Sequence, residues 1–280
     1  MKYTIISDSC CNIFAKDLNS SQIDFHVVPL TLILGNEEFI DDDKLDTRKF
    51  VEKMNGQKIA ARSACPSPEA FAEIMRKGDN IIVVTISAKL SATNASAVTA
   101  ASIIKKEFPN KNICVIDTLT ACTGQDRVLF KLKEVIESGK HSFDDVAEKF
   151  TQICHSTRVR FLLQDLGNLI KNGRMNKVVG TMLSAAKIKV ICGENEEGEI
   201  KKFGLSLGTK KGLANLAEFP KAAGREADNL ITVAHVHNEE DALFIKKMLE
   251  TKFGFRNVKV LLMRGLSSLY AADKGIVIAY

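Results

Sequence analysis

The sequence predicts an α/β protein in which an N-terminal, mostly parallel sheet with flanking helices precedes a C-terminal α+β domain with antiparallel pairing. Three observations indicate this fold class. The chain has 280 residues, enough for about two domains of roughly 150 residues each. Hydrophobic residues make up 45% and charged residues 26%, a balance typical of folded chains and unlike that of disordered ones. The pattern of short apolar runs also changes between the two halves of the chain.

In the first half, short apolar runs alternate with longer segments of helical periodicity. The expected strands are Tyr3–Ile6, Val27–Leu34, Ile81–Ile86 and Ile113–Ile116. The expected helices are Thr47–Met54, Glu69–Arg76, Leu90–Lys106, Arg127–Ser138 and Asp144–Cys154, the last capped by Ser142 with Asp145. Strands separated by helices indicate βαβ units, so we expect the strands to be parallel with right-handed crossovers.

The second half has a different pattern. Lys187–Cys192 and Glu199–Phe203 flank the turn-like segment Gly193–Gly198, which predicts a hairpin. Further expected elements are the strands Leu230–His235, Val258–Met263 and Gly275–Tyr280 and the helix Glu239–Thr251. We place the domain boundary near residue 156. The domains 1–156 and 157–280 are expected to pack directly on each other, because no Pro-, Gly- or Ser-rich linker separates them.

Composition excludes several classes of protein. The net charge is +5, and the basic residues gather only in pairs such as Lys201-Lys202, so we expect no nucleic-acid partner. No signal peptide is apparent and no apolar run approaches the length of a membrane span, so we expect transient membrane contact at most. Seven cysteines at irregular spacing argue against a disulfide framework and favour a cytoplasmic location.

Motifs for the common cofactors and metals are missing. The chain contains no G-x-G-x-x-G after the first strand, no P-loop, no H-E-x-x-H and no paired C-x-x-C. His235 and His237 have no third ligand at a suitable spacing, and Asp41-Asp42-Asp43 is interpreted as a solvated turn and not as a cation site. We therefore expect no cofactor and no metal.

Three of the predicted strands run into hydroxyl-rich turns. These turns are Ser7-Asp8-Ser9, Ser87–Thr93 and Asp117–Thr120. If the strands are parallel, the turns meet at one edge of the sheet, where open α/β sheets bind ligands. Hydroxyl groups beside the start of the helix near Ser91 would suit an anionic head group such as a carboxylate or phosphate. The alternative is that these side chains only cap helices.

One motif favours an enzyme. Gly204-Leu205-Ser206-Leu207-Gly208 matches the G-x-S-x-G nucleophile elbow, and Asp228 and His235 follow in the order of a serine hydrolase. Those two residues lie on one extended segment, about 23 Å apart at roughly 3.3 Å per residue, so they cannot touch. The charged strand before the motif is also expected to be peripheral. A Ser-dependent hydrolase or acyl transferase, using Ser206 or Ser91, is therefore the alternative to a binding protein.

A series of motifs along nearly the whole chain resembles the DegV family of bacterial fatty-acid-binding proteins. In order, they are Ser7-Asp8-Ser9 (T-D-S in the family), Val28-Pro29-Leu30 (V-P-L), Phe39-Ile40-Asp41 (Y-x-D), Ser63–Ser67 (T-S-Q-P-S), Ser87–Thr93 (S-S-x-L-S-G-T), Asp117-Thr118 (D-S), Leu169–Met175 (L-x-K-G-G-R-I) and the strand-end His235. The order and spacing of these motifs together are specific.

The resemblance implies a lipid-binding carrier protein with no catalytic activity of its own. Such a protein holds one long-chain fatty acid in a tunnel between its two domains and presents it to a fatty acid kinase, which forms an acyl phosphate for phospholipid metabolism. Carried over to this chain, Ser63 and Ser91 would hydrogen-bond the carboxylate, with Thr93 and Ser87 in support. Arg174 would lie near the head group or at the surface that faces the kinase.

The chain departs from the family pattern in places that bear on both partners. Leu207-Gly208 stands where the family often has Arg-Gly, and Ser268–Ala272 replaces the late H-x-G-P-G loop. Ser267, Ser268 or Tyr270 would then supply the missing donor. A lipid sensor or store uncoupled from a kinase is the second alternative. We expect Phe71, Phe161 or Met182 among the residues that line the tunnel, although core packing is the more common role for such side chains.

Overall fold

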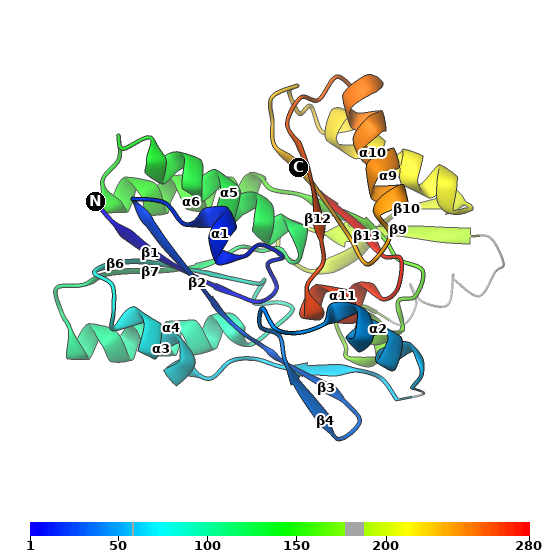
Figure 1. The fold of residues 1–280 in the computed structure, drawn as a ribbon. Coiled ribbons are helices and arrows are strands. Elements are labelled where there is room, and N and C mark those ends of the chain that lie inside the picture. Colours follow the sequence, from blue (N-terminus) through cyan, green and yellow to red (C-terminus); the bar gives the residue numbers. More distant parts are fainter. Residues whose placement is uncertain (58, 177–187) are drawn as a thin grey trace.

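The computed structural model describes residues 1–57, 59–176 and 188–280. Its first sheet has the strand order β2-β1-β6-β7, and all its strands are parallel, as predicted. The strands are β1 (Tyr3–Asp8), β2 (Ile23–Val28), β6 (Asn80–Thr85) and β7 (Asn112–Asp117). Alternate residues of these strands face opposite helix layers. Ile5 and Ile82 pack with α5 (Thr123–Glu137) and α6 (Phe143–Ser156), while Ile6 and Ile81 pack with α3 (Pro68–Met75) and α4 (Thr93–Glu107) (Figure 1).

The predicted strand Val27–Leu34 is wrong as a single element. The chain leaves β2 at Val28 and re-forms a strand only at Thr31, because Pro29 has no N–H with which to continue the ladder. β3 (Thr31–Leu34) instead belongs to a small antiparallel sheet of order β4-β3-β5, with β4 (Glu37–Ile40) and β5 (Arg62–Ala64). α2 (Thr47–Asn55) lies between β4 and β5 in sequence, and the short α1 (Ala15–Leu18) follows β1.

The second half of the chain forms a six-stranded sheet of order β10-β9-β8-β13-β11-β12. Its strands are β8 (Val159–Leu162), β9 (Ile188–Glu194), β10 (Ile200–Leu207), β11 (Ile231–His235), β12 (Val258–Leu262) and β13 (Ile276–Ala279). β9 and β10 form the predicted antiparallel hairpin. α9 (Thr209–Ala222) and α10 (Glu239–Thr251) pack on one face of the sheet, which directs its other face toward the first half of the molecule (Figure 1).

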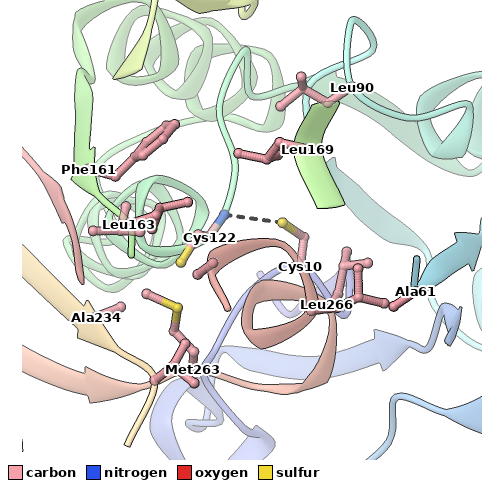
Figure 2. Packing of buried hydrophobic residues seen from close by; sticks show 14 of the residues in the cluster. Cys10, Ala61, Leu90, Cys122, Phe161, Leu163, Leu169, Ala234, Met263 and Leu266 are labelled. Carbon is pink, nitrogen blue, oxygen red and sulfur yellow. Dashed lines mark hydrogen bonds between the residues drawn. The ribbon is translucent and has the colours of Figure 1, made fainter. Parts of the chain in front are cut away.

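One hydrophobic cluster joins the two halves of the chain. Leu32 and Phe50 from the first half share it with Phe161, Cys192 and Leu266 from the second. Figure 2 shows part of this cluster, in which the Cys122 N–H donates a hydrogen bond of 3.1 Å to the Cys10 thiol sulfur. The boundary near residue 156 stays a prediction; in sequence it falls between α6 and β8.

The cluster includes two short helices, α7 (Gly167–Lys171) and α11 (Gly265–Ala271). Most of Ser268–Ala272, which we interpreted as the counterpart of a loop, is therefore helical. Across the described ranges, no helix is long and apolar enough to cross a membrane.

A buried clasp fixes the start of α11. The Asp41 carboxylate accepts hydrogen bonds of 2.9 Å from both Gly265 N and Leu266 N. Arg264 donates to the Asp41 carbonyl oxygen at 3.1 Å, and its own backbone N–H donates to Asn12 Oδ1 at 3.0 Å. A Cβ atom at position 265 would lie 2.5 Å from Asp41 Oδ1, so this close approach requires glycine.

The clasp corrects the interpretation of Asp41-Asp42-Asp43 as a solvated turn. Asp43 is exposed, but Asp41 is fully buried and is held by residues more than 200 positions away in the sequence. Asn12 extends the clasp into the first half, because its side-chain amide donates to Asp126 Oδ2 at 2.7 Å. The position of α11 therefore depends on a polar network that includes both halves of the chain.

We predict that Asp41→Ala lowers the free energy of unfolding by about 3 kcal/mol, because it leaves two buried backbone donors without their acceptor and removes the negative charge near Arg264. Urea unfolding measures this loss. Asp43→Ala, at the exposed end of the same turn, is the matched control and should change the free energy by less than about 0.5 kcal/mol. Equal losses in the two variants would contradict a structural role specific to Asp41.

Candidate ligand-binding site

The predicted meeting of three turns at one edge of the first sheet is confirmed. Asp8, at the end of β1, accepts hydrogen bonds from Ile86 N at 2.7 Å and from Gln125 Nε2 at 3.1 Å. Ser87 N donates to the Thr120 carbonyl at 2.8 Å, which joins the turns after β6 and β7. Burial raises the pKa of Asp8 to about 6. Many of these polar groups thus tie the turns to one another.

Beside these turns lies a mostly apolar cavity of about 80 Å³. The six-stranded sheet contributes Val159, Phe161 and Val277 to its lining, and α11 contributes Leu266 and Ala271. The turns of the first half add Cys10, Ile86 and Cys122. The cavity is therefore an interface pocket that requires both halves of the chain. We expected three apolar side chains to line a tunnel. Phe161 lines this pocket, whereas Phe71, on α3, packs in the cluster between the first sheet and α4. Met182 lies outside the described residues.

Polar side chains are few in the pocket wall. The Ser267 hydroxyl donates to the Cys10 carbonyl at 3.0 Å. Tyr270 lines the pocket and its hydroxyl lies 3.1 Å from Ser63 Oγ, so the predicted site residue Ser63 reaches the pocket through Tyr270 without lining it. Arg174 also lines the pocket, and its Nε donates to the Leu90 carbonyl at 3.1 Å.

The other predicted site residues are close in sequence to residues that line the pocket, but they do not line it themselves. Ser91 and Thr93 hydrogen-bond each other at 2.8 Å at the start of α4, directly after the lining residue Leu90. The Ser87 hydroxyl donates to the Gly198 carbonyl at 2.9 Å, which attaches the β9–β10 turn to the first half. Ser268 is fully buried and donates to the carbonyl of Met263, which precedes α11, at 3.3 Å. The roles predicted for these residues in ligand binding stay predictions.

A surface hollow of about 500 Å³ adjoins the pocket. Leu90, Arg174 and Ile200 line both spaces and so form the boundary between them. Lys89, Lys201 and Lys202 surround the outer hollow, with Glu199 as its acidic residue. We call this outer hollow the mouth; its basic side chains outnumber its acidic one, so it suits an anionic group.

Glu194 is a pocket residue that we did not predict, because we placed it in the turn Gly193–Gly198. β9 in fact extends to Glu194, whose side chain is buried and lines the pocket. Burial raises the pKa of its carboxyl to about 8 against the opposing effects of Thr120, the Ala121 N–H and Arg160. The alternation of Val190, Cys192 and Glu194 could have revealed it, since every second residue of a strand points to the same face.

The three residues of the G-x-S-x-G hydrolase alternative are bonded to other partners and not to one another. Ser206 donates to the Gly208 carbonyl at 3.3 Å, and Asp228 accepts from Arg256 Nε at 2.6 Å on the exposed surface. His235 Nδ1 accepts from Asn238 N at 3.1 Å. β10, which carries Ser206, is one of the two edge strands of its sheet, in agreement with the peripheral position that its charged sequence predicted. Within residues 1–57, 59–176 and 188–280, no cluster of three or more His, Cys, Asp or Glu side chains could hold a metal ion.

The fold and site define a two-domain α/β protein with a mostly apolar pocket at the interface of its two parts. The chain belongs to the DegV family, since the family model described as "Uncharacterised protein, DegV family" matches residues 2–278. A DegV domain-containing protein of Streptococcus gordonii is 33% identical over 282 residues, which cover 100% of this chain and 99% of the relative.

Two solved structures are also similar over their full length. One is the Streptococcus pneumoniae Fatty Acid Kinase (Fak) B3 protein loaded with linoleic acid, with a TM-score of 0.95 and 31% identity, covering 100% of this chain and 99% of that one. The other is a DegV family protein from Eubacterium eligens loaded with heptadecanoic acid, with a TM-score of 0.91 and 32% identity, covering 99% of this chain and 98% of that one.

We predict that Glu194→Gln makes stability less dependent on pH. The carboxyl has an ordinary pKa of 4.5 and a folded-state pKa of about 8. The neutral carboxyl therefore contributes its full stabilisation below pH 4.5. Between pH 4.5 and about 8 this contribution falls by about 1.4 kcal/mol per pH unit, and it is lost once the pH has passed about 8. Urea unfolding at several values across this range should show the wild type losing stability relative to Glu194→Gln. Glu197→Gln, at an exposed position of the same hairpin, is the control, and a parallel profile for all three proteins would contradict the prediction.

Proposed function

We propose that this protein is a cytoplasmic carrier that binds one long-chain fatty acid in a tunnel between domains 1–156 and 157–280. The observation that carries the proposal is the interface pocket, whose lining is apolar except for a few polar groups. The linoleic acid of the pneumococcal relative and the heptadecanoic acid of the Eubacterium relative support this class of ligand. The seven free cysteines support a reducing location.

The acyl chain would supply most of the affinity. Burying about 14 methylenes at ~0.8 kcal/mol each contributes on the order of 11 kcal/mol before the costs of binding. The cavity of about 80 Å³ is smaller than typical ligand pockets of roughly 300–1,000 Å³. We therefore propose that lining side chains move apart as the acyl chain enters, so that binding exchanges contacts within the protein for contacts with the ligand.

The head group would be held by hydroxyls and not by a direct ion pair. Ser63 with Tyr270, and Ser91 with Thr93, form two hydroxyl pairs whose hydrogens can turn toward a carboxylate. Tyr270 is a better substitute than Ser268 for the missing donor, because Tyr270 lines the pocket and the Ser268 hydroxyl already donates to the Met263 carbonyl. Ser87 would act in support, by fixing the β9–β10 turn.

The positive mouth would orient the acid and leave its carboxylate within reach of a kinase that forms the acyl phosphate. Arg174 lies between the pocket and the outer hollow, as a residue near the head group or the kinase should. Leu205 and Leu207 are exposed at alternate positions of the edge strand β10 and form a small apolar strip beside the basic residues. We propose that this strip contacts the kinase in place of the missing arginine. A lipid sensor or store without a kinase remains the alternative, and transient membrane contact would load either.

We predict that native mass spectrometry of gently purified protein detects one bound fatty acid, which lipid extraction identifies. Ala271→Phe fills the lining at α11 with an aromatic ring and should abolish the bound mass while the circular dichroism spectrum is retained. Ala222→Phe, at an exposed position of α9, is the control and should keep the lipid. Wild-type protein that carries no lipid and takes up no C14–C18 acid would overturn the proposal.

We predict that Ser63→Ala and Tyr270→Phe each weaken fatty acid binding about tenfold, because each removes a hydrogen bond to a charged group worth about 1.5 kcal/mol or more. Displacement of a fluorescent fatty acid measures the affinity. Ser138→Ala, on the exposed end of α5, should leave it unchanged. Affinities within twofold of wild type for both pocket variants would place the carboxylate elsewhere.

A further inference from the structure

Glu194 introduces a carboxyl group into a pocket wall that consists mainly of apolar side chains. The side chain is 5% exposed and lines the same pocket as Val159, Ile86 and Ile200. An apolar acyl chain would gain nothing from this group. A buried polar group that faces only hydrocarbon lowers affinity, since it loses the water that could hydrogen-bond it.

The contacts of Glu194 within the protein do not use all of its hydrogen-bonding capacity. The Ala121 N–H and the Thr120 hydroxyl lie against the carboxyl. Thr120 Oγ1, however, is buried without a hydrogen bond of ordinary geometry. Arg160 is directed elsewhere, because its Nη1 donates to the backbone carbonyls of Val159 and Glu194. A carboxyl group has four lone-pair sites and, when protonated, one donor, so a ligand can add a further hydrogen bond.

The surroundings of the pocket indicate which kind of ligand group would do so. A cationic group is disfavoured, because Lys89, Arg174 and the lysines of β10 surround the mouth through which it would pass. A second carboxylate would be repelled whenever Glu194 is ionised. A neutral hydroxyl satisfies the carboxyl in either protonation state, because it both donates and accepts.

We propose that Glu194 selects fatty acids whose acyl chain carries a hydroxyl group, which it hydrogen-bonds inside the pocket. This inference rests on the proposed binding of a fatty acid and specifies the class of acid. Glu194 comes from β9 and lies against the Thr120–Ala121 turn, whereas the Ser63–Tyr270 hydroxyl pair comes from β5 and α11. The chain hydroxyl and the carboxylate would therefore be recognised by different elements of the fold.

Competition binding with stearic acid and with hydroxystearic acids substituted at C3, C10, C12 or C18 tests the proposal. Wild-type protein should bind at least one hydroxystearic acid about tenfold more tightly than stearic acid. Glu194→Leu should remove this preference, mainly by improving the binding of stearic acid. Glu194→Gln retains a donor and an acceptor and should keep part of the preference. Glu197→Leu, at an exposed position of the same hairpin, should behave as wild type.

The outcomes separate this inference from the proposed function. If stearic acid binds wild-type protein as tightly as every hydroxystearic acid, the role of Glu194 is overturned while fatty acid binding stands. A preference that persists unchanged in Glu194→Leu also overturns it. If no acid of either kind binds, the proposed function itself is contradicted, and the inference with it.

Discussion

The arrangement of the molecule depends on the buried clasp at the start of α11. Asp41 holds two backbone N–H groups of that helix, while Arg264 and Asn12 connect the same point to Asp126. These groups are withdrawn from water, so each needs the others, and their geometry fixes where α11 begins. Because α11 carries Leu266, Ser267, Tyr270 and Ala271 into the pocket wall, an interaction outside the pocket determines its shape.

The polar residues near the interface of the two halves have two different roles. Asp8 and Thr118 use their oxygens to join segments at the edge of the first sheet, and the Ser87 hydroxyl attaches the β9–β10 turn to that edge. Ser63, Tyr270, Arg174 and Glu194 instead reach or adjoin a mostly apolar cavity. The first group makes a rigid edge and the second is available to a ligand. The hydroxyl-rich turns supply the first group, whereas no residue of the second group lies in those turns.

Local patterns were sufficient to predict most of the fold. The strands β1, β6 and β7, the helices α2 to α6 and the β9–β10 hairpin follow from periodicity and turn residues that lie within each segment. The break at Pro29 and the helix α11 were not predicted, and the buried state of Asp41 depends on partners 224 and 225 residues away. The Ser63–Tyr270 pair spans 207 residues and was equally invisible. Glu194 was missed for a different reason, because its place in the strand alternation was overlooked.

The central claim is that a fatty acid occupies the interface pocket with its carboxylate at the Ser63–Tyr270 hydroxyl pair. A crystal structure of the protein with its bound lipid tests this claim most directly. We expect the acyl chain to pass along Phe161, Val277 and Ala271, and the carboxylate oxygens to lie within hydrogen-bonding distance of Ser63 Oγ and Tyr270 Oη. An acyl chain bound outside this pocket, or a carboxylate held away from both hydroxyls, would contradict the account.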